Sequence, residues 1–296
     1  YVGNITDSVK DILTKDPKGI KTTKSVDDVD RASNNYTFLG NRHNAFDIIQ
    51  RLQPKAGGVG YDDKKKSDYG FLFFETFDGY HFRSLRSLFE PEPETEYVKS
   101  EISGTGDFVI DNYNFSSGND VVLNLKSGLY NNETTFVELD KTKITKIKFN
   151  MDETEDLTLK PPKVPVNVEG KPSRIMLRVV DTGVHQHYEE NDTSLENVQK
   201  FTDLAVYQNK SYIRNNLLFS QSFKISTSLN PDLRVGQIIE IKLPVKKGDG
   251  ESKTDSYGND KTNDPSGKYL ISGLRQIIGG QKSESQLTLI RDVFTA

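Results

Sequence analysis

The last third of the chain constrains the fold most, because its hydrophobic pattern changes period partway through. Over residues 195–213 the apolar side chains recur on a helical period within an arc of about 120°, which predicts an amphipathic helix with one buried face. After Asn215 and Asn216 the period becomes two, so that Phe223 and Ile225 fall on one side and polar residues alternate with them. This second pattern predicts a half-buried β-strand.

Three more strands are expected after this one. The sequence Asn230-Pro231-Asp232 predicts a turn, and the next strand, 239–243, ends at Pro244, which cannot donate a ladder hydrogen bond. Residues 246–267 contain almost nothing apolar and predict a long exposed loop. Strands over 269–274 and 287–290 then form a hairpin around Gly279-Gly280. Together these elements predict at least four antiparallel strands, as in a β-barrel.

The first hundred residues predict a small α+β module. Two helices are expected, over residues 7–13 with an N-cap at Thr6 and over residues 45–52 with an N-cap at Asn44. Two aromatic strands follow on either side of Asp78-Gly79, a pair that is typical of a two-residue type I′ turn.

The sequence Glu90 to Glu96, with two prolines and four glutamates, predicts a stiff linker. Beyond it we expect a strand within 102–113, a helix over 119–127 that Gly128 closes in the left-handed conformation, and strands over 134–140, 143–149 and 174–180. The expected parts are an α+β module over 1–95, the first part of a barrel over 96–150, an inserted subdomain over 151–194 and the second part of the barrel over 195–296.

Composition excludes several classes of function. A formal charge of −4 without a basic stripe argues against a nucleic-acid-binding protein, which needs cations to displace counterions from phosphate. Zero Cys excludes disulfides, thiolate metal sites and Cys nucleophiles. No apolar run approaches about 18 residues, so no stable membrane association is expected.

A search for catalytic patterns finds none of the common ones: no Gly-x-Ser-x-Gly, no His-Glu-x-x-His and no P-loop. The 43 acidic residues leave a glycosidase pair open on composition, but they concentrate in turns and linkers. His185 and His187 could face one metal ion, yet no carboxylate or third His stands at ligand spacing. We therefore expect no catalytic residue, no metal and no cofactor.

Several short sequence segments, in their order along the chain, resemble those of the baseplate hub proteins of T-even-like contractile-tailed phages. The earliest is the aromatic hairpin around Phe73, and the next runs from Asn124 to Tyr130. The others are the end of the 195–213 helix, the run from Asn230 to Ile239, and the closing Leu-Thr-Leu-Ile-Arg-Asp. The positions that match the family's structural motifs are Gly128, Tyr130, Tyr212, Arg214, Leu233, Val235, Gly236, Arg291 and Asp292.

The resemblance implies an α+β fold of mainly antiparallel strands, in which an inserted subdomain splits a tube-forming β-barrel and a small α+β module precedes it. The family's first tube-forming barrel would precede Tyr1. Such a hub forms a homotrimer in the tail baseplate of the virion and is assembled in the host cytoplasm. It joins the tail tube and the tape-measure protein to a cell-puncturing spike, often of lysozyme type, and DNA only passes through its channel.

Two other functions stay open at this stage. One is a cell-wall hydrolase associated with a phage particle, and the other is a monomeric β-module that uses its long polar loops to bind a glycan or a receptor. A stable trimer would separate the hub from both alternatives.

Overall fold

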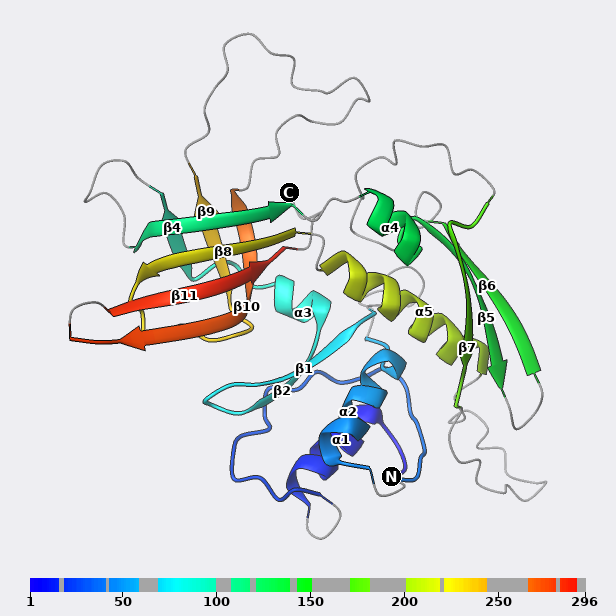
Figure 1. Cartoon of the computed structure of the whole chain (residues 1–296). Helices are drawn as coiled ribbons and strands as arrows, with labels where there is room; N and C mark the ends of the chain where they lie inside the picture. Colours follow the sequence, from blue (N-terminus) through cyan, green and yellow to red (C-terminus); the bar gives the residue numbers. More distant parts are fainter. Residues whose placement is uncertain are drawn as a thin grey trace. The chain divides into compact units, whose positions relative to one another are not determined.

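The computed structural model describes residues 1–15, 19–40, 43–58, 69–99, 108–117, 121–138, 143–150, 171–181, 201–218, 221–243, 266–280 and 283–291. These residues form two compact units, which Figure 1 shows in the colours of the sequence. The first unit takes its described residues from the ranges 1–87, 125–156 and 171–215, and the second from 88–124 and 216–296. Each unit has its own hydrophobic core.

The first unit begins with two short helices, as predicted. Helix α1 (Ile5–Thr14) is capped by Asn4, whose side-chain oxygen accepts the N–H of Thr6 at 3.0 Å. The expected cap at Thr6 is therefore wrong, because the Thr6 hydroxyl instead donates to the carbonyl of Asp30 at 2.7 Å. Helix α2 (Ala45–Leu52) buries the predicted apolar face and continues into a short 3₁₀ helix, η1 (Gln53–Lys55).

The aromatic hairpin is present, but its turn is longer than predicted. Strands β1 (Phe71–Glu75) and β2 (Tyr80–Ser84) pair from Phe71↔Ser84 to Glu75↔Tyr80, which leaves a four-residue loop. The N–H of Thr76 donates to the carbonyl of Gly79 at 2.9 Å, and φ is positive at neither central residue. Hydrogen bonds of the Thr76 side chain hold this wider turn. A short helix, α3 (Leu85–Phe89), follows the hairpin.

The same unit contains a three-stranded sheet in the order β6-β5-β7. Its strands are β5 (Asn131–Glu138), β6 (Lys143–Asn150) and β7 (Arg174–Val179). Helix α5 (Phe201–Leu218) packs on the inner face of this sheet, where the Arg178 guanidinium lies 4.3 Å from the centroid of the Tyr212 ring. The helix continues through Asn215 and Asn216, beyond the predicted end.

These strands correct the expected division of the chain. Residues 96–150 were expected to belong to the barrel, but β5 pairs with β6 on one side and with β7 on the other. The reason is burial: Phe136 of β5 is fully buried in the core of the first unit, and Thr134 contacts Asn209 of α5. The segment that interrupts the barrel therefore begins within helix α4 (Val121–Ser127), which Gly128 closes as predicted, at φ +76°.

The second unit is a closed β-barrel in the order β10-β11-β8-β4-β3-β9. Its inward side chains form a continuous core that includes Tyr97, Phe223, Ile225, Tyr269 and Leu289. The predicted antiparallel pairing of the last strands is confirmed, whereas the short strand β3 lies parallel to both of its neighbours. The strands are β3 (Thr95–Val98), β4 (Phe108–Ser117), β8 (Gln221–Ser228), β9 (Ile238–Lys242), β10 (Gly267–Ile278) and β11 (Ser283–Ile290).

The fold is therefore α+β with mainly antiparallel strands, and its barrel is split by an insertion, as the sequence predicted. Among the described residues, no helix combines the length and the apolar character needed to cross a membrane.

Candidate assembly interface

The barrel is closed along only part of its longest strands. Strand β4 pairs with β3 at Phe108 and Val109 alone, whereas it pairs with β8 from Ile110 to Ser117. Strand β10 pairs with β9 only from Gly267 to Leu270, whereas it pairs with β11 as far as Ile278. Beyond these points the strands continue as a four-stranded sheet, β4-β8-β11-β10, which we call the open sheet (Figure 1).

The open sheet has two edges, residues 112–117 of β4 and residues 272–278 of β10. Along the outer side of each, no strand pairs with it among the residues that the structure describes. Each edge begins at a register shift, between Ile110 and Asn112 in β4 and between Ile271 and Gly273 in β10. A β-bulge bends a strand and increases its twist. The two bulges therefore turn both strands away from the partners that close the barrel.

Specific hydrogen bonds end the closed part at each edge. Next to β4, the ammonium group of Lys99 donates to the carbonyls of Ile110 at 2.8 Å and Asp111 at 2.6 Å. Next to β10, Ile271 donates its N–H to Gln237 and accepts the N–H of Gly236. These bonds satisfy the last backbone groups of the closed part, so the edges begin at defined residues.

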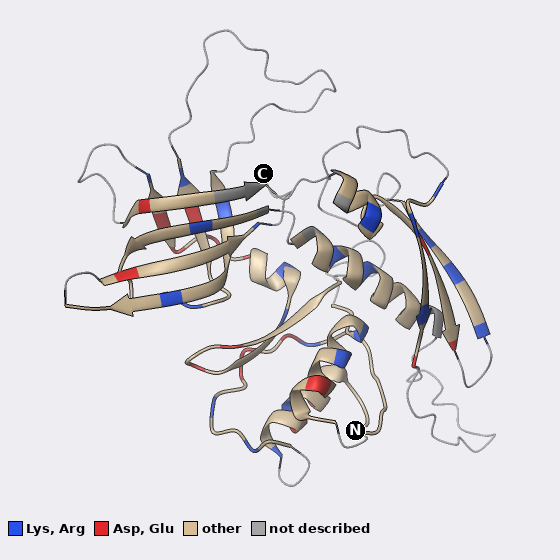
Figure 2. Cartoon of the chain, in the orientation of Figure 1, with Lys and Arg blue, Asp and Glu red and all other residues tan. Residues whose placement is uncertain are grey.

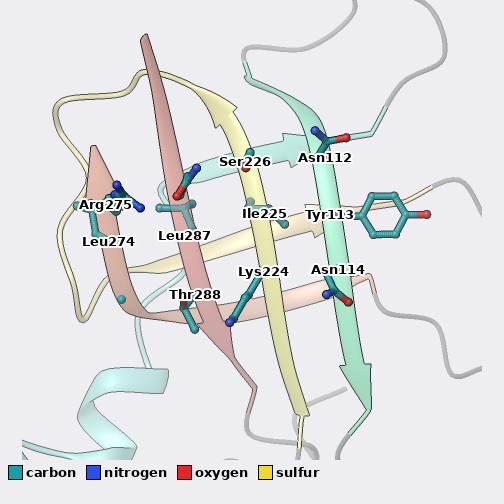
Figure 3. Close-up of a pocket in the computed structure, with 12 residues that line it drawn as sticks. Asn112, Tyr113, Asn114, Lys224, Ile225, Ser226, Leu274, Arg275, Leu287 and Thr288 are labelled. Carbon is teal, nitrogen blue, oxygen red and sulfur yellow. The ribbon is translucent and has the colours of Figure 1, made fainter. Parts of the chain in front are cut away.

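The open sheet carries a hollow of about 600 Å³ (Figure 3). Most side chains that line it end in an amide, a hydroxyl or a cation, and no carboxylate is among the lining residues. The cations are Lys224 and Arg275, and the residues beside them include Asn112, Asn114, Ser226, Gln286 and Thr288.

The motif residues of the second unit hold the barrel closed. Leu233 is buried in the barrel core, and Gly236, at φ +93°, donates its N–H to Ile271 at 2.9 Å. Val235 packs against the same core. The Arg291 guanidinium lies 5.6 Å from the centroid of the Tyr269 ring and donates to the carbonyl of Ser266 at 3.1 Å. Asp292 lies outside the described residues.

The remaining motif residues lie in the first unit. The Tyr212 hydroxyl donates to the carbonyl of Ser127 at 3.2 Å, directly before Gly128, and Tyr130 and Arg214 are buried. The motif positions therefore form no single site, because they hold turns and packing in both units. The sequence analysis did not predict the open edges. The one signal for them was Gly273, a glycine inside a long strand, which lies at the register shift where the edge of β10 begins.

Sequence reasoning also missed a hydrogen-bonded chain in the aromatic hairpin. His81 lies between Thr76, 2.8 Å from its Nε2, and Asp28, 2.7 Å from its Nδ1. This order matches a nucleophile, a base and an orienting acid. However, Asp28 also binds the Arg83 guanidinium, and the Thr76 hydroxyl accepts the N–H of Gly79 at 3.3 Å. Both groups therefore have structural roles: Asp28 ties the hairpin to the segment 24–30, and the Thr76 hydroxyl holds the hairpin turn.

A second polar cluster ties the end of β7 to the N-terminal helices. The Lys55 ammonium donates to the Tyr36 hydroxyl and to the Asp181 carbonyl, and it lies 3.7 Å from the Asp181 carboxylate. Burial lowers the pKa of Lys55 despite this acid. Burial first, and the Asp181 carboxylate second, raise the pKa of Tyr36. The cluster therefore has a structural role, and burial shifts the pKa values of Lys55 and Tyr36 within it.

Within the described ranges, no group of three or more His, Asp or Glu side chains could share a metal ion. His185 and His187 lie outside these ranges.

Comparison with known proteins gives similarity at the level of the fold. Neither a protein-family model nor a curated protein matches the sequence. The structure is similar to the crystal structure of the tail protein from Neisseria meningitidis MC58, with a TM-score of 0.50 and 14% identity over 98% of this chain and 67% of that one. The 43 kDa tail protein of prophage MuSo2 from Shewanella oneidensis gives a TM-score of 0.47 and 9% identity over 98% and 64%. The chain thus spans about two thirds of the length of each neighbour.

Proposed function

We propose that this chain is a structural component of a phage tail, the central hub of the baseplate, and that copies of it assemble into a ring through the edges of the open sheet. One observation carries the proposal. Strand directions alternate across β10, β11, β8 and β4, so the two open edges run antiparallel to each other. The edge of β4 in one copy can therefore pair with the edge of β10 in the next and continue the same antiparallel sheet.

Such an interface is heterologous, because its two sides are different surfaces of the chain. Heterologous contacts give a closed ring when the rotation between copies closes, and a filament when it does not. A homotrimer is the state that we propose. The fold similarity to a Neisseria tail protein supports the assignment to a tail. In this role the ring would join the tail tube and the tape-measure protein to a cell-puncturing spike.

Native mass spectrometry of the full chain, alone and with a spike protein, tests the proposal. We expect a trimer in at least one of these conditions. The double variant Asn114→Lys and Ile278→Lys places a charge on each open edge, and edge lysines oppose strand pairing. Because Ile278 is 78% exposed, this variant should keep its melting temperature and lose the trimer.

The matched control is Phe77→Lys, which changes an apolar side chain that is 87% exposed in the first unit. It should assemble like the wild type. A chain that stays monomeric under both conditions, or a trimer that is insensitive to charges on the edges, would contradict the proposed interface.

The alternative of a cell-wall hydrolase has one observation in its favour, the Thr76–His81–Asp28 chain. Release of soluble fragments from purified peptidoglycan, abolished in a folded His81→Asn variant, would support that alternative. We expect no release from either protein.

A further inference from the structure

Strand β7 shows the reverse of the alternation that a half-buried strand normally has. Its aliphatic side chains Ile175, Leu177 and Val179 are 73%, 73% and 58% exposed, whereas Arg178 turns toward α5. Strand β7 pairs with β5 in parallel, and parallel strands are normally covered on both faces. A slip of one residue would exchange the two sets of side chains. The observed register therefore exposes the apolar set.

Contacts along the whole strand fix this register. Arg178 lies over the Tyr212 ring, and Arg174 donates to the carbonyl of Lys126 at 3.1 Å. At the two ends, Ser173 donates its N–H to Asn131 at 3.1 Å and Val180 donates its N–H to Val137 at 3.0 Å. Because both arginines are engaged on the inner side, the exposure of the aliphatic row is a built feature of the fold.

The aliphatic row continues onto the neighbouring strands. Val137 of β5 is paired with Val179 on one side and with Ile144, which is 61% exposed, on the other. We call this surface, the side of the β6-β5-β7 sheet opposite α5, the outer face. In the first unit no described element covers it (Figure 1). Contiguous exposed apolar surface of this kind marks interaction sites.

Charge distinguishes the two sides of the outer face. Strand β6 presents Lys146 and Lys148 beside the aliphatic row, and Figure 2 shows the basic bands along this strand. One acidic residue, Glu133, shares the face and lies 3.8 Å from the Lys146 ammonium. Lysines on an edge strand also oppose the addition of another strand there. A partner is therefore expected to lie on the face, with aliphatic side chains over β7 and carboxylates over β6.

The dimensions of the face fit one α-helix. Strands β6 and β7 are two strand spacings apart, about 10 Å, which is close to the diameter of a helix with its side chains. The six residues of β7 extend about 20 Å, the length of a helix of about 13 residues. Helix α5 already packs in this way on the inner face.

We infer that the outer face binds an amphipathic helix of a partner protein, with an aliphatic ridge seated along Ile175, Leu177 and Val179 and a flank of carboxylates over the lysines of β6. The inference does not rest on the proposed ring, because the outer face belongs to the first unit and the open edges to the second. Failure of one leaves the other intact.

Two synthetic helical peptides of about 14 residues test the inference. Both carry the same leucine ridge, and the flank beside it carries Glu in one peptide and Lys in the other. Titration of each peptide into the full chain by isothermal calorimetry should give binding of the Glu peptide alone. Salt should weaken this binding, because the flanking ion pairs are exposed.

The variant Leu177→Glu should bind the Glu peptide at least about tenfold more weakly, since it replaces the central apolar contact by a like charge. Leu177→Thr, which suits an exposed strand, should weaken binding without any added charge. Phe77→Glu is the matched control, because it changes another exposed apolar residue elsewhere in the same unit and should leave binding unchanged. Circular dichroism melts confirm that each variant is folded.

Three results would overturn the inference. The first is equal affinity for the Glu and Lys peptides, and the second is unchanged affinity in Leu177→Glu. The third is that neither peptide binds. In that case, self-association of the chain through Leu177 would identify a second copy as the occupant. Binding of the chain to anionic vesicles alone would likewise overturn the inference.

Discussion

Replacement of Gly128 by alanine should destabilise the first unit strongly. Gly128 has φ +76°, a conformation that costs an L-residue about 1–2 kcal/mol. A Cβ atom added there would lie 2.9 Å from the Cβ of Arg174 and 3.0 Å from that of Asn132. Both of these atoms are attached directly to backbone, so relief requires movement of β5 or β7. Such overpacking costs about 1–3 kcal/mol. The sum is a loss of about 2–5 kcal/mol.

Urea unfolding, followed by the tyrosine fluorescence and the circular dichroism of the full chain, measures this loss. Gly280→Ala is the matched control, because a Cβ there would meet nothing within 4 Å, and its effect should stay within about 0.5 kcal/mol. Gly128→Asn separates the two causes, since Asn tolerates the left-handed conformation but keeps the Cβ atom. A loss below about 1 kcal/mol in Gly128→Ala would refute the reasoning.

Two further predictions concern the cores of the two units. Because burial raises the pKa of Tyr36, the folded chain keeps this hydroxyl protonated after the unfolded chain has begun to ionise near pH 10, so that stability falls as pH rises above about 10. Tyr36→Phe should remove this part of the alkaline loss, as measured by melting temperature from about pH 9 to 11, and an unchanged slope would contradict the assignment. In the barrel, Phe223 is fully buried between Tyr269 and Tyr113, so Phe223→Ala should cost about 3–5 kcal/mol in urea unfolding. Tyr113→Ala, at a half-exposed position, should cost much less, and similar losses at both positions would show that the barrel does not depend on this core contact.

Local pattern predicted many of the elements, although not the short α3 and β3, and it did not predict how the elements group. The period-two runs located β8 and β9, and Gly128 was correctly read as a left-handed cap. The grouping failed at β5, because whether an alternating strand joins a barrel or another sheet depends on its partner. That partner is β7, whose reversed alternation gives an ambiguous signal.

The candidate interface escaped sequence reasoning for a similar physical reason. An open edge arises where two paired strands differ in length, and the sequence of one strand does not show which strand it pairs with. Strand β10 runs for 12 residues beside a five-residue β9, and only the register shows that its second half has β11 as its described partner.

The strand edges of the chain differ in how many charged residues they carry against pairing with another chain, and this difference bears on assembly. The edge strand β6 carries three lysines, Lys143, Lys146 and Lys148, the usual protection against pairing with another chain. The open edge of β4, residues 112–117, contains no lysine and no proline, and residues 272–278 of β10 contain a single charge, Arg275. An edge left without such protection forms sheets with whatever strand it meets. The alternating strand directions make the two edges antiparallel, and the bulges turn them away from the closed barrel. The strand that each edge meets in an assembly can therefore be the complementary edge of a neighbouring copy. If the edges were merely unprotected, charges placed on them would raise solubility without changing the mass of the particle. If they form the ring, the same charges must convert a trimer into monomers.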